Sequence, residues 1–118
     1  MNIETLYTER AGLAESPVWD DAAQCFFWID IPNRRIHRHT MDNAHTIWQL
    51  LDDAANDPGA IALNDSGNLV VALRSGIALF DVATPAGDIS LTPFITAPYD
   101  TNDIRFNDGG VDAQGRFW

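Results

Sequence analysis

The segment VWDDAAQCFFW, at residues 18–28, recurs in similar form twice more along the chain, as ALNDSGNLVVA (62–72) and GVDAQGRFW (110–118). Each copy runs from an apolar residue to an Asp or Asn, then through turn residues into a β-rich run. These Asp or Asn anchors are 44 and 48 residues apart, and they are Asp20, Asn64 and Asp112. A four-stranded propeller blade takes about 40–50 residues, so the period indicates a β-propeller; the alternative is chance similarity among hairpin turns.

Short β-rich runs, separated by Pro, Asn, Asp and Gly, fill the intervals. They are QCFFWID (24–30), RRIHRH (34–39), HTIWQL (45–50), AIALN (60–64), NLVVALR (68–74), GIALFDV (76–82) and ISLTPFI (89–95). Such runs are typical of all-β sandwiches, barrels and propellers, and the repeat favours the propeller. The Asp-rich LLDDAAND (50–57) is predicted to be a loop. We therefore predict one truncated all-β domain over residues 1–118, made of two to three blades.

The composition argues against several classes of function. The chain is 46% hydrophobic, which excludes disorder. Its formal net charge is −10 and all seven basic residues are Arg, so its average surface repels nucleic-acid backbones and anionic membranes. No apolar run is long enough to span a bilayer, and MNIETLYTER (1–10) lacks the pattern of a signal peptide. We expect a cytoplasmic protein that binds neither nucleic acid nor membrane; a neutral or cationic ligand, or a metal ion, suits its charge better.

Two turn signals lie almost side by side near the end of the chain, NDGG (107–110) and DAQG (112–115). The repeat assigns residues 112–115 to the hairpin turn. No room is left for a strand between the two signals, so residues 107–110 are expected in the short strand that leads into the hairpin. In a propeller this strand is the innermost and lines the central channel. Gly109 and Gly110 there predict a close backbone approach to a neighbouring blade or a ligand.

The positions five residues before the anchors are equivalent in the repeat, and they are Glu15, Gly59 and Asn107. We expect them around the mouth of the channel. Glu15 stands in the otherwise apolar GLAESPVW, where a carboxylate needs an Arg, backbone N–H groups or a metal ion. Contact with a metal or substrate and a structural hydrogen bond are equal alternatives at this point.

Arg105 and Asn107 are two residues apart, so on a strand they would project to the same face. An Arg fork beside a carboxamide can hold the hydroxyls and ring oxygens of a polar small molecule. The alternative for Arg105 is a surface ion pair with Asp103 or Asp108.

His37 and His39 also share a strand face, as a metal-binding pair would. They lie among cationic neighbours, which are Arg34, Arg35 and Arg38. We therefore predict an exposed outer strand rather than a metal site. Cys25 is the single cysteine and lies in an apolar run, so it is predicted to be a buried, unreactive thiol.

Three stretches, GLAESPVWDD (12–21), FFWIDIPNRRIHR (26–38) and RFNDGGVDAQGRFW (105–118), resemble the senescence marker protein-30 (regucalcin), gluconolactonase and sugar-lactonase family. The resemblance runs in order along the whole chain. It implies a six-bladed β-propeller with one divalent metal ion in the central channel, which hydrolyses sugar lactones to aldonic acids. It further implies that Glu15 is a metal ligand and that Arg105 and Asn107 contact the sugar lactone.

The chain lacks part of the site that the resemblance implies. In that family the remaining metal ligands, an Asn and an Asp, come from later blades, and the Asp is the usual candidate for the general base. At about 45 residues per blade, the chain makes roughly two and a half blades. We therefore expect an N-terminal piece of a longer protein, with the catalytic base downstream of Trp118 and the metal open among Ca, Zn, Mn, Mg and Fe.

Two further expectations concern the chain by itself. It should be inactive, because one confident ligand cannot hold a divalent ion, and it should self-associate through open blade faces. The alternative functions are a non-enzymatic propeller scaffold and a calcium-binding regulator of the same fold.

Overall fold

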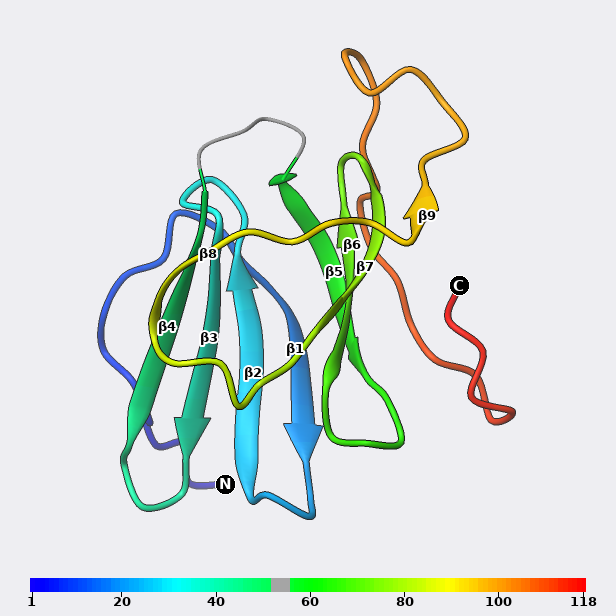
Figure 1. Cartoon of the computed structure of the whole chain (residues 1–118). Coiled ribbons are helices and arrows are strands. Elements are labelled where there is room, and N and C mark those ends of the chain that lie inside the picture. The colour runs from blue at the N-terminus through cyan, green and yellow to red at the C-terminus, as the bar shows by residue number, and fades with distance from the viewer. Residues whose placement is uncertain (52–55) are drawn as a thin grey trace.

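The computed structural model describes residues 1–51 and 56–118, which form two twisted sheets (Figure 1). The first sheet is an antiparallel meander of β1 (Ala14–Asp20), β2 (Cys25–Asp30), β3 (Arg35–Thr40) and β4 (His45–Leu50). A fifth strand, β8 (Gly87–Ile89), pairs in parallel with β4 at the outer edge.

The second sheet contains β5 (Pro58–Leu63), β6 (Leu69–Leu73), β7 (Gly76–Phe80) and β9 (Ile95–Thr96), paired antiparallel in that order. None of the described residues forms an α-helix, so the predicted all-β class is confirmed. Within the described ranges, no helix is long and apolar enough to cross a membrane.

The three anchors of the repeat behave alike. The anchors are Asp20, Asn64 and Asp112. In each of them the side-chain Oδ1 accepts hydrogen bonds of 2.9–3.0 Å from two backbone N–H groups of the turn that follows. Short polar side chains stabilise turns in this way. The third turn is closed by a 2.9 Å bond from the Gly115 N–H to the Asp112 carbonyl. The predicted hairpin at residues 112–115 is therefore confirmed.

The core lies between the two sheets. Alternate residues of β2, Cys25, Phe27 and Ile29, are buried in it, as the two-residue period of a strand dictates. Trp48 of β4 joins the sheets, with its ring edge-on to Phe80 of β7 at 5.0 Å. The first strands of the two sheets, β1 and β5, lie next to each other (Figure 1), as the inner strands of consecutive blades do.

One predicted strand is wrong. The run 89–95 is split between the sheets: Ile89 ends β8, where its carbonyl accepts a 2.9 Å bond from the Leu51 N–H, and Ile95 begins β9. Pro93 lies between them and has no N–H to give to a ladder. The loop predicted at 50–57 includes residues 52–55, which lie outside the described residues.

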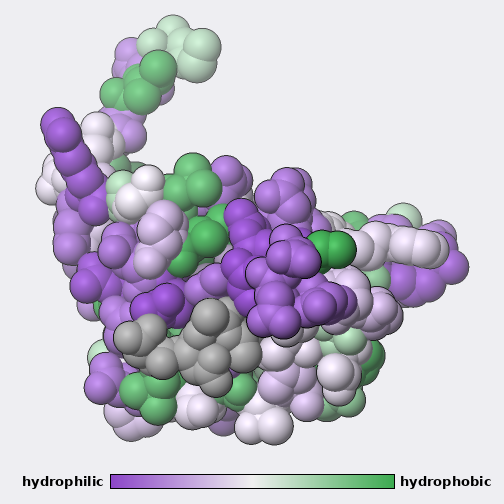
Figure 2. Space-filling view, turned by 90° about the horizontal axis from the view of Figure 1, so that it is seen from above, coloured by the Kyte–Doolittle hydropathy of each residue, from purple (hydrophilic) through white to green (hydrophobic). Residues whose placement is uncertain are grey.

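The face of the molecule in Figure 2 is mainly hydrophilic. Figure 2 shows polar residues over most of the face seen from above, with separate hydrophobic patches between them. Several large hydrophobic side chains of the second sheet and its C-terminal extension are more than half exposed, and they are Leu79, Phe94, Ile95, Ile104 and Trp118.

Candidate functional site

The inner strands of the two sheets meet the chain segment that follows the second sheet. Glu15 is the second residue of β1 and Gly59 is the second residue of β5. A Cβ at Gly59 would lie 2.2 Å from the carbonyl oxygen of Phe106, so the backbone just before Asn107 crosses directly over β5. The three positions that the repeat makes equivalent therefore belong to neighbouring segments. Asn107 differs from the other two because residues 105–110 form no strand.

A bulge in β1 sets the backbone next to Glu15. Glu15 pairs with Ile29 and Val18 pairs with Phe27, so two residues of β1 oppose one residue of β2. Ser16 adopts a φ of 56°, a conformation that side-chain-bearing residues seldom take. Bulges commonly re-aim a side chain beside a functional site.

The same bulge is hydrogen-bonded to the second sheet. Ser16 Oγ donates to the Ile61 carbonyl at 3.2 Å and accepts from the Ile61 N–H at 2.9 Å. This pair of bonds satisfies both polar groups of a residue in β5. The strained backbone beside Glu15 is therefore held in place by the neighbouring blade rather than by its own sheet.

A hollow of about 570 Å³ lies where these segments meet. Its walls are the residues from Glu15 to Trp19 of β1, three residues of β5 (61–63) and the stretch 108–111. Glu15 and Asp108 are both among its lining residues. Two acidic groups in one hollow favour a cation or an electrophilic ligand. Arg105 and Asn107 do not line this hollow, but they immediately precede its Asp108 wall.

Glu15 is exposed, and its side chain makes no hydrogen bond or ion pair with the residues that the structure describes. The structural hydrogen bond that sequence reasoning offered as one alternative is therefore not found within residues 1–51 and 56–118. Its oxygen lone pairs stay available to a ligand from solvent.

Arg105 is half-buried, and one of its terminal nitrogens, Nη1, donates to the Phe106 carbonyl at 2.8 Å. The alternative ion pairs with Asp103 or Asp108 are not formed in the described part of the chain. The bond to Phe106 orients the guanidinium and leaves its other N–H groups available to donate to a ligand. Asn107 is exposed. The expected same-face arrangement of the two side chains on a strand is wrong, because no strand is present there.

The glycines of NDGG differ from each other. A Cβ at Gly109 would lie 2.7 Å from the Phe117 ring, so Gly109 is closely approached by the chain's own hairpin and not, as predicted, by a neighbouring blade or a ligand. A Cβ at Gly110 would meet nothing within 4 Å, so the same prediction is wrong there. The sequence analysis named Asp108 only as a possible ion-pair partner of Arg105 and did not predict it at the site. Its position directly after Asn107 in RFNDGG was the feature that could have indicated this role.

The residues present fit a hard divalent cation in part. Carboxylate oxygens are the ligands that Ca²⁺, Mg²⁺ and Mn²⁺ prefer, and Glu15 and Asp108 supply them. No group of three His, Cys, Asp or Glu side chains with metal-binding geometry occurs among the described residues. Ca²⁺ takes about six to eight oxygen ligands, so further ligands must come from water or from residues beyond those described.

The other candidates lie away from this hollow. His37 and His39 are only 4% and 5% exposed, so the predicted exposed strand is wrong. Their cover comes from Tyr7, whose ring centroid lies 6.3 Å and 5.9 Å from theirs. Cys25 is buried, as predicted, and burial raises the pKa of its thiol.

Comparison with known proteins gives the relatives of the chain. A family model described as the SMP-30/gluconolactonase/LRE-like region matches residues 13–118. The 6-deoxy-6-sulfogluconolactonase of Pseudomonas putida is 37% identical over 107 residues, covering 90% of this chain and 34% of that protein. Regucalcin of Gallus gallus is 32% identical over 118 residues, covering 100% of this chain and 37% of that protein. The chain thus spans about a third of the length of the curated relatives it matches.

Solved structures share the fold. A regucalcin from Agrobacterium tumefaciens, described as a calcium-binding protein, superposes with a TM-score of 0.79 at 25% identity, over 96% of this chain and 36% of that one. A luciferin-regenerating enzyme superposes with a TM-score of 0.76 at 24% identity, over 92% and 35%, and supports the fold alone. The two sheets are therefore blades of a partial β-propeller, as the repeat predicted.

Proposed function

Because the chain belongs to the SMP-30/gluconolactonase/LRE-like family, we propose that it forms part of a metal-dependent hydrolase that opens sugar lactones to aldonic acids. The observation that carries the proposal is the hollow that Glu15 of β1 shares with the stretch directly after Arg105 and Asn107. An acidic group without a partner among the described residues, followed by a cation-and-amide pair in the neighbouring segment, suits a polar substrate bound beside a divalent ion.

Glu15 is proposed as the metal ligand within this chain. Its carboxylate is exposed to the hollow and bonds to none of the described residues, so ion binding would not break an existing contact. The chemistry supplied by a bound divalent ion is Lewis-acid polarisation of the lactone carbonyl. The strained backbone at Ser16, tied to β5, would fix the direction of the Glu15 side chain.

Arg105 and Asn107 are proposed as substrate contacts. The Arg105 guanidinium is oriented by its bond to the Phe106 carbonyl, and its remaining N–H groups can donate to hydroxyls or the ring oxygen of the sugar. Asn107 can both donate and accept. Water adds to the acyl carbon, the ring C–O bond breaks, and a carboxylic acid and a hydroxyl result. The base that takes the proton of the water is proposed to lie outside this chain.

The test is Glu15→Gln in the longest polypeptide that the gene encodes. Gln keeps the size of the side chain but removes the anionic ligand, so metal-dependent release of acid from aldonolactones should be lost. Glu4→Gln is the matched control, because Glu4 is exposed and removing its charge leaves the hollow unchanged. Unchanged metal-dependent turnover in E15Q would remove Glu15 from the site. Turnover by the wild type without any added or bound divalent ion would overturn the metal dependence.

A calcium-binding role without turnover is the second candidate. Two carboxylates line the hollow, and a structural neighbour is described as a calcium-binding protein. Calcium binding that depends on Glu15, together with no acid release from a panel of aldonolactones, would favour this role over the lactonase.

For residues 1–118 alone, we propose inactivity and self-association. The ligands found among the described residues are too few for a tightly held ion. Leu79 of β7 and Ile95 of β9 are 56% and 53% exposed, and they offer an apolar sheet edge to another copy. Light scattering should give a mass above the 13.0 kDa of one chain; a monodisperse monomer with metal-dependent turnover would contradict both statements. A cytoplasmic location is part of the proposal, and cell fractionation tests it.

A further inference from the structure

The chain reaches the proposed substrate contact Arg105 through a loop, residues 97–104, that follows β9 and rises beyond the end of the second sheet (Figure 1). A turn shapes the middle of this loop. Asp100 Oδ1 accepts hydrogen bonds from the backbone N–H and the side-chain amide of Asn102, at 3.0 and 2.9 Å. That turn is local, so contacts with the second sheet must decide where the loop lies.

Arg74, in the turn between β6 and β7, makes two of those contacts. Its Nη1 donates to the carbonyls of Thr101 and Ile104, at 3.1 and 3.3 Å. The Nη1 atom carries two N–H groups, so one is available for each carbonyl. Ile104 is the residue directly before Arg105. The Arg74 side chain therefore fixes the backbone at the point where the loop leads into Arg105.

Asp57, the residue before β5, orients the Arg74 side chain. Its Oδ2 accepts hydrogen bonds from Arg74 Nε at 3.1 Å and from Arg74 Nη2 at 3.0 Å. The Asp57 backbone carbonyl accepts a further bond of 2.8 Å from the Arg74 N–H. Both side chains are only 21% exposed, and charge-assisted bonds of this kind are stronger than neutral ones. Because the guanidinium is planar and rigid, these bonds also set the direction of Nη1.

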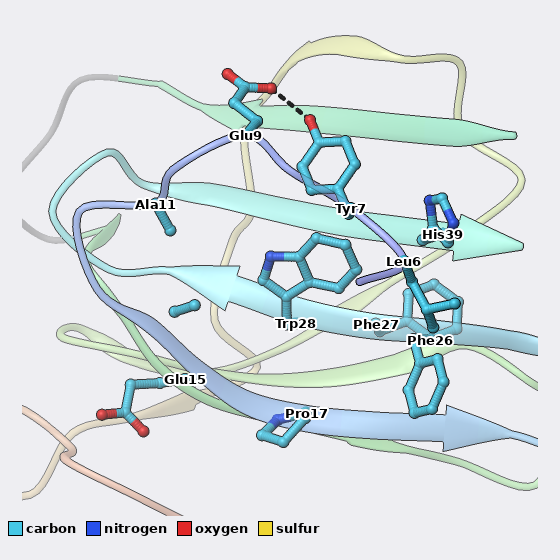
Figure 3. Close-up of a pocket in the computed structure, with 11 residues that line it drawn as sticks. Leu6, Tyr7, Glu9, Ala11, Glu15, Pro17, Phe26, Phe27, Trp28 and His39 are labelled. Carbon is cyan, nitrogen blue, oxygen red and sulfur yellow. Dashed lines mark hydrogen bonds between the residues drawn. The ribbon is translucent and has the colours of Figure 1, made fainter. Parts of the chain in front are cut away.

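The same carboxylate reaches the first sheet. Asp57 Oδ1 lies 3.6 Å from Nη1 of Arg34, in the turn between β2 and β3. The strand next to β2 is β1, which carries Glu15. The Glu15 side chain points away from the aromatic rings drawn with it (Figure 3), and Glu15 lines the hollow of the candidate site. Asp57 and Arg74 therefore join the sheet of the proposed metal ligand to the loop that leads to the proposed substrate contact.

Arg105 is also fixed from its other side. The backbone of Phe106, the next residue, crosses directly over β5. Arg105 Nη1 donates to the Phe106 carbonyl at 2.8 Å. Arg105 thus lies between two fixed points of the backbone, the Ile104 carbonyl that Arg74 holds and the crossing of Phe106.

We propose that Arg74 is a positioning residue for the lactonase site: it holds the two loop carbonyls and thereby sets the place of Arg105 at the substrate. Arg74 directs its donors to Asp57 and the loop, so it acts through Arg105 and not on the substrate itself. No proton or electron passes through it. The inference rests on the proposed function, because the place of Arg105 matters to turnover only if the site takes a lactone.

Arg74→Lys in the longest polypeptide that the gene encodes tests the inference. Lys keeps the positive charge beside Asp57 but carries its donors on one nitrogen, so it cannot span the carboxylate and both carbonyls. A shift of Arg105 by about 1 Å should lower kcat/KM for aldonolactones about 10- to 100-fold. Arg10→Lys is the matched control, because Arg10 is exposed and lies outside the hollow, so its kinetics should match the wild type.

The division of the loss between KM and kcat separates positioning from a merely structural role. Hydrogen bonds from Arg105 to the sugar are made in the bound substrate and in the transition state alike, so R74K should mainly raise KM. If Arg74 only stabilised the fold, R74K would reduce the concentration of active molecules. The apparent kcat would then fall with the folded fraction, measured by circular dichroism, and KM would stay at the wild-type value. That result would overturn the inference.

A double-mutant cycle with Arg105→Met identifies the route by which Arg74 acts. In R105M the contact that Arg74 positions is already lost, so adding R74K should lower kcat/KM by less than about twofold. Losses that multiply in the double variant would show that Arg74 acts by another route, and would overturn the inference. Absence of turnover by the wild type would overturn the proposed function and this inference with it. Wild-type turnover with an unchanged KM in R74K would overturn the positioning role alone.

Discussion

Replacing Gly59 by Ala probes how β5 positions the segment that carries Arg105 and Asn107. The φ of Gly59 is not in the left-handed region, so the change adds a methyl group without backbone strain of its own. The new Cβ would lie 2.2 Å from the Phe106 carbonyl oxygen, and ordinary contact begins at 3.4 Å. The obstacle is backbone and cannot rotate away. The segment must therefore retreat by about 1.2 Å, or β5 must bend.

The expected cost has two parts. Overpacking of this kind destabilises by about 1–3 kcal/mol, which denaturant unfolding of residues 1–118 would measure. A shift of about 1 Å in the substrate contacts should lower kcat/KM for lactones about 100-fold in the active polypeptide, if the proposed function holds. The loss of stability is expected whether or not the protein is a lactonase.

Gly110→Ala is the matched control for the same experiment. It makes the same chemical change at a glycine of the segment that follows Phe106, but its Cβ would meet nothing within 4 Å. Its stability should match that of the wild type or exceed it by about 0.4–1 kcal/mol, because the unfolded chain loses freedom. Equal unfolding free energies for G59A and G110A would refute the claim that the Phe106 backbone packs against β5.

Three other outcomes follow from the packing. Ser16→Ala should cost about 1–3 kcal/mol in unfolding free energy, because the Ile61 N–H loses its acceptor between the blades. Trp48→Phe should cost about 1–3 kcal/mol, because the fully buried ring shrinks and the Thr84 carbonyl loses its donor. The free energy of unfolding should fall as pH drops from 6.5 toward 4, because His45 binds a proton more weakly in the folded chain than in the unfolded chain. After allowance for solvent screening, the loss in unfolding free energy is on the order of 1–2 kcal/mol. Thermal melts across that pH range would detect it, and a flat profile would contradict the lowered His45 pKa.

Local chemistry explains what could be predicted from the sequence. The anchors Asp20, Asn64 and Asp112 were identifiable because an Asx side chain bonds the turn that follows it, within a few residues. Their spacing then gave the blade period. The burial of Cys25 followed from the apolar run around it in the same way.

Non-local pairing explains what could not be predicted. β8 follows β7 in the chain but joins the first sheet beside β4, and no local pattern encodes that return. The burial of His37 and His39 depends on Tyr7, which comes from a segment with no strand or helix period. The irregular course of residues 105–110 replaced the strand expected there. Asp108 came to the hollow with Glu15 because of that course.

The two inner strands show how one repeated backbone is put to two uses. Both β1 and β5 carry a register shift close to the position five residues before the anchor, between Glu15 and Val18 and between Pro58 and Ala60. The first strand puts a carboxylate at that position, which an ion or substrate can reach. The second puts Gly59 there, and only the absence of a Cβ lets the Phe106 backbone cross. A side chain at Gly59 would displace the Phe106 backbone, and with it the Arg105–Asn107 segment that leads into the Asp108 wall of the hollow. Gly59 therefore positions those residues without contacting a ligand itself, which G59A tests.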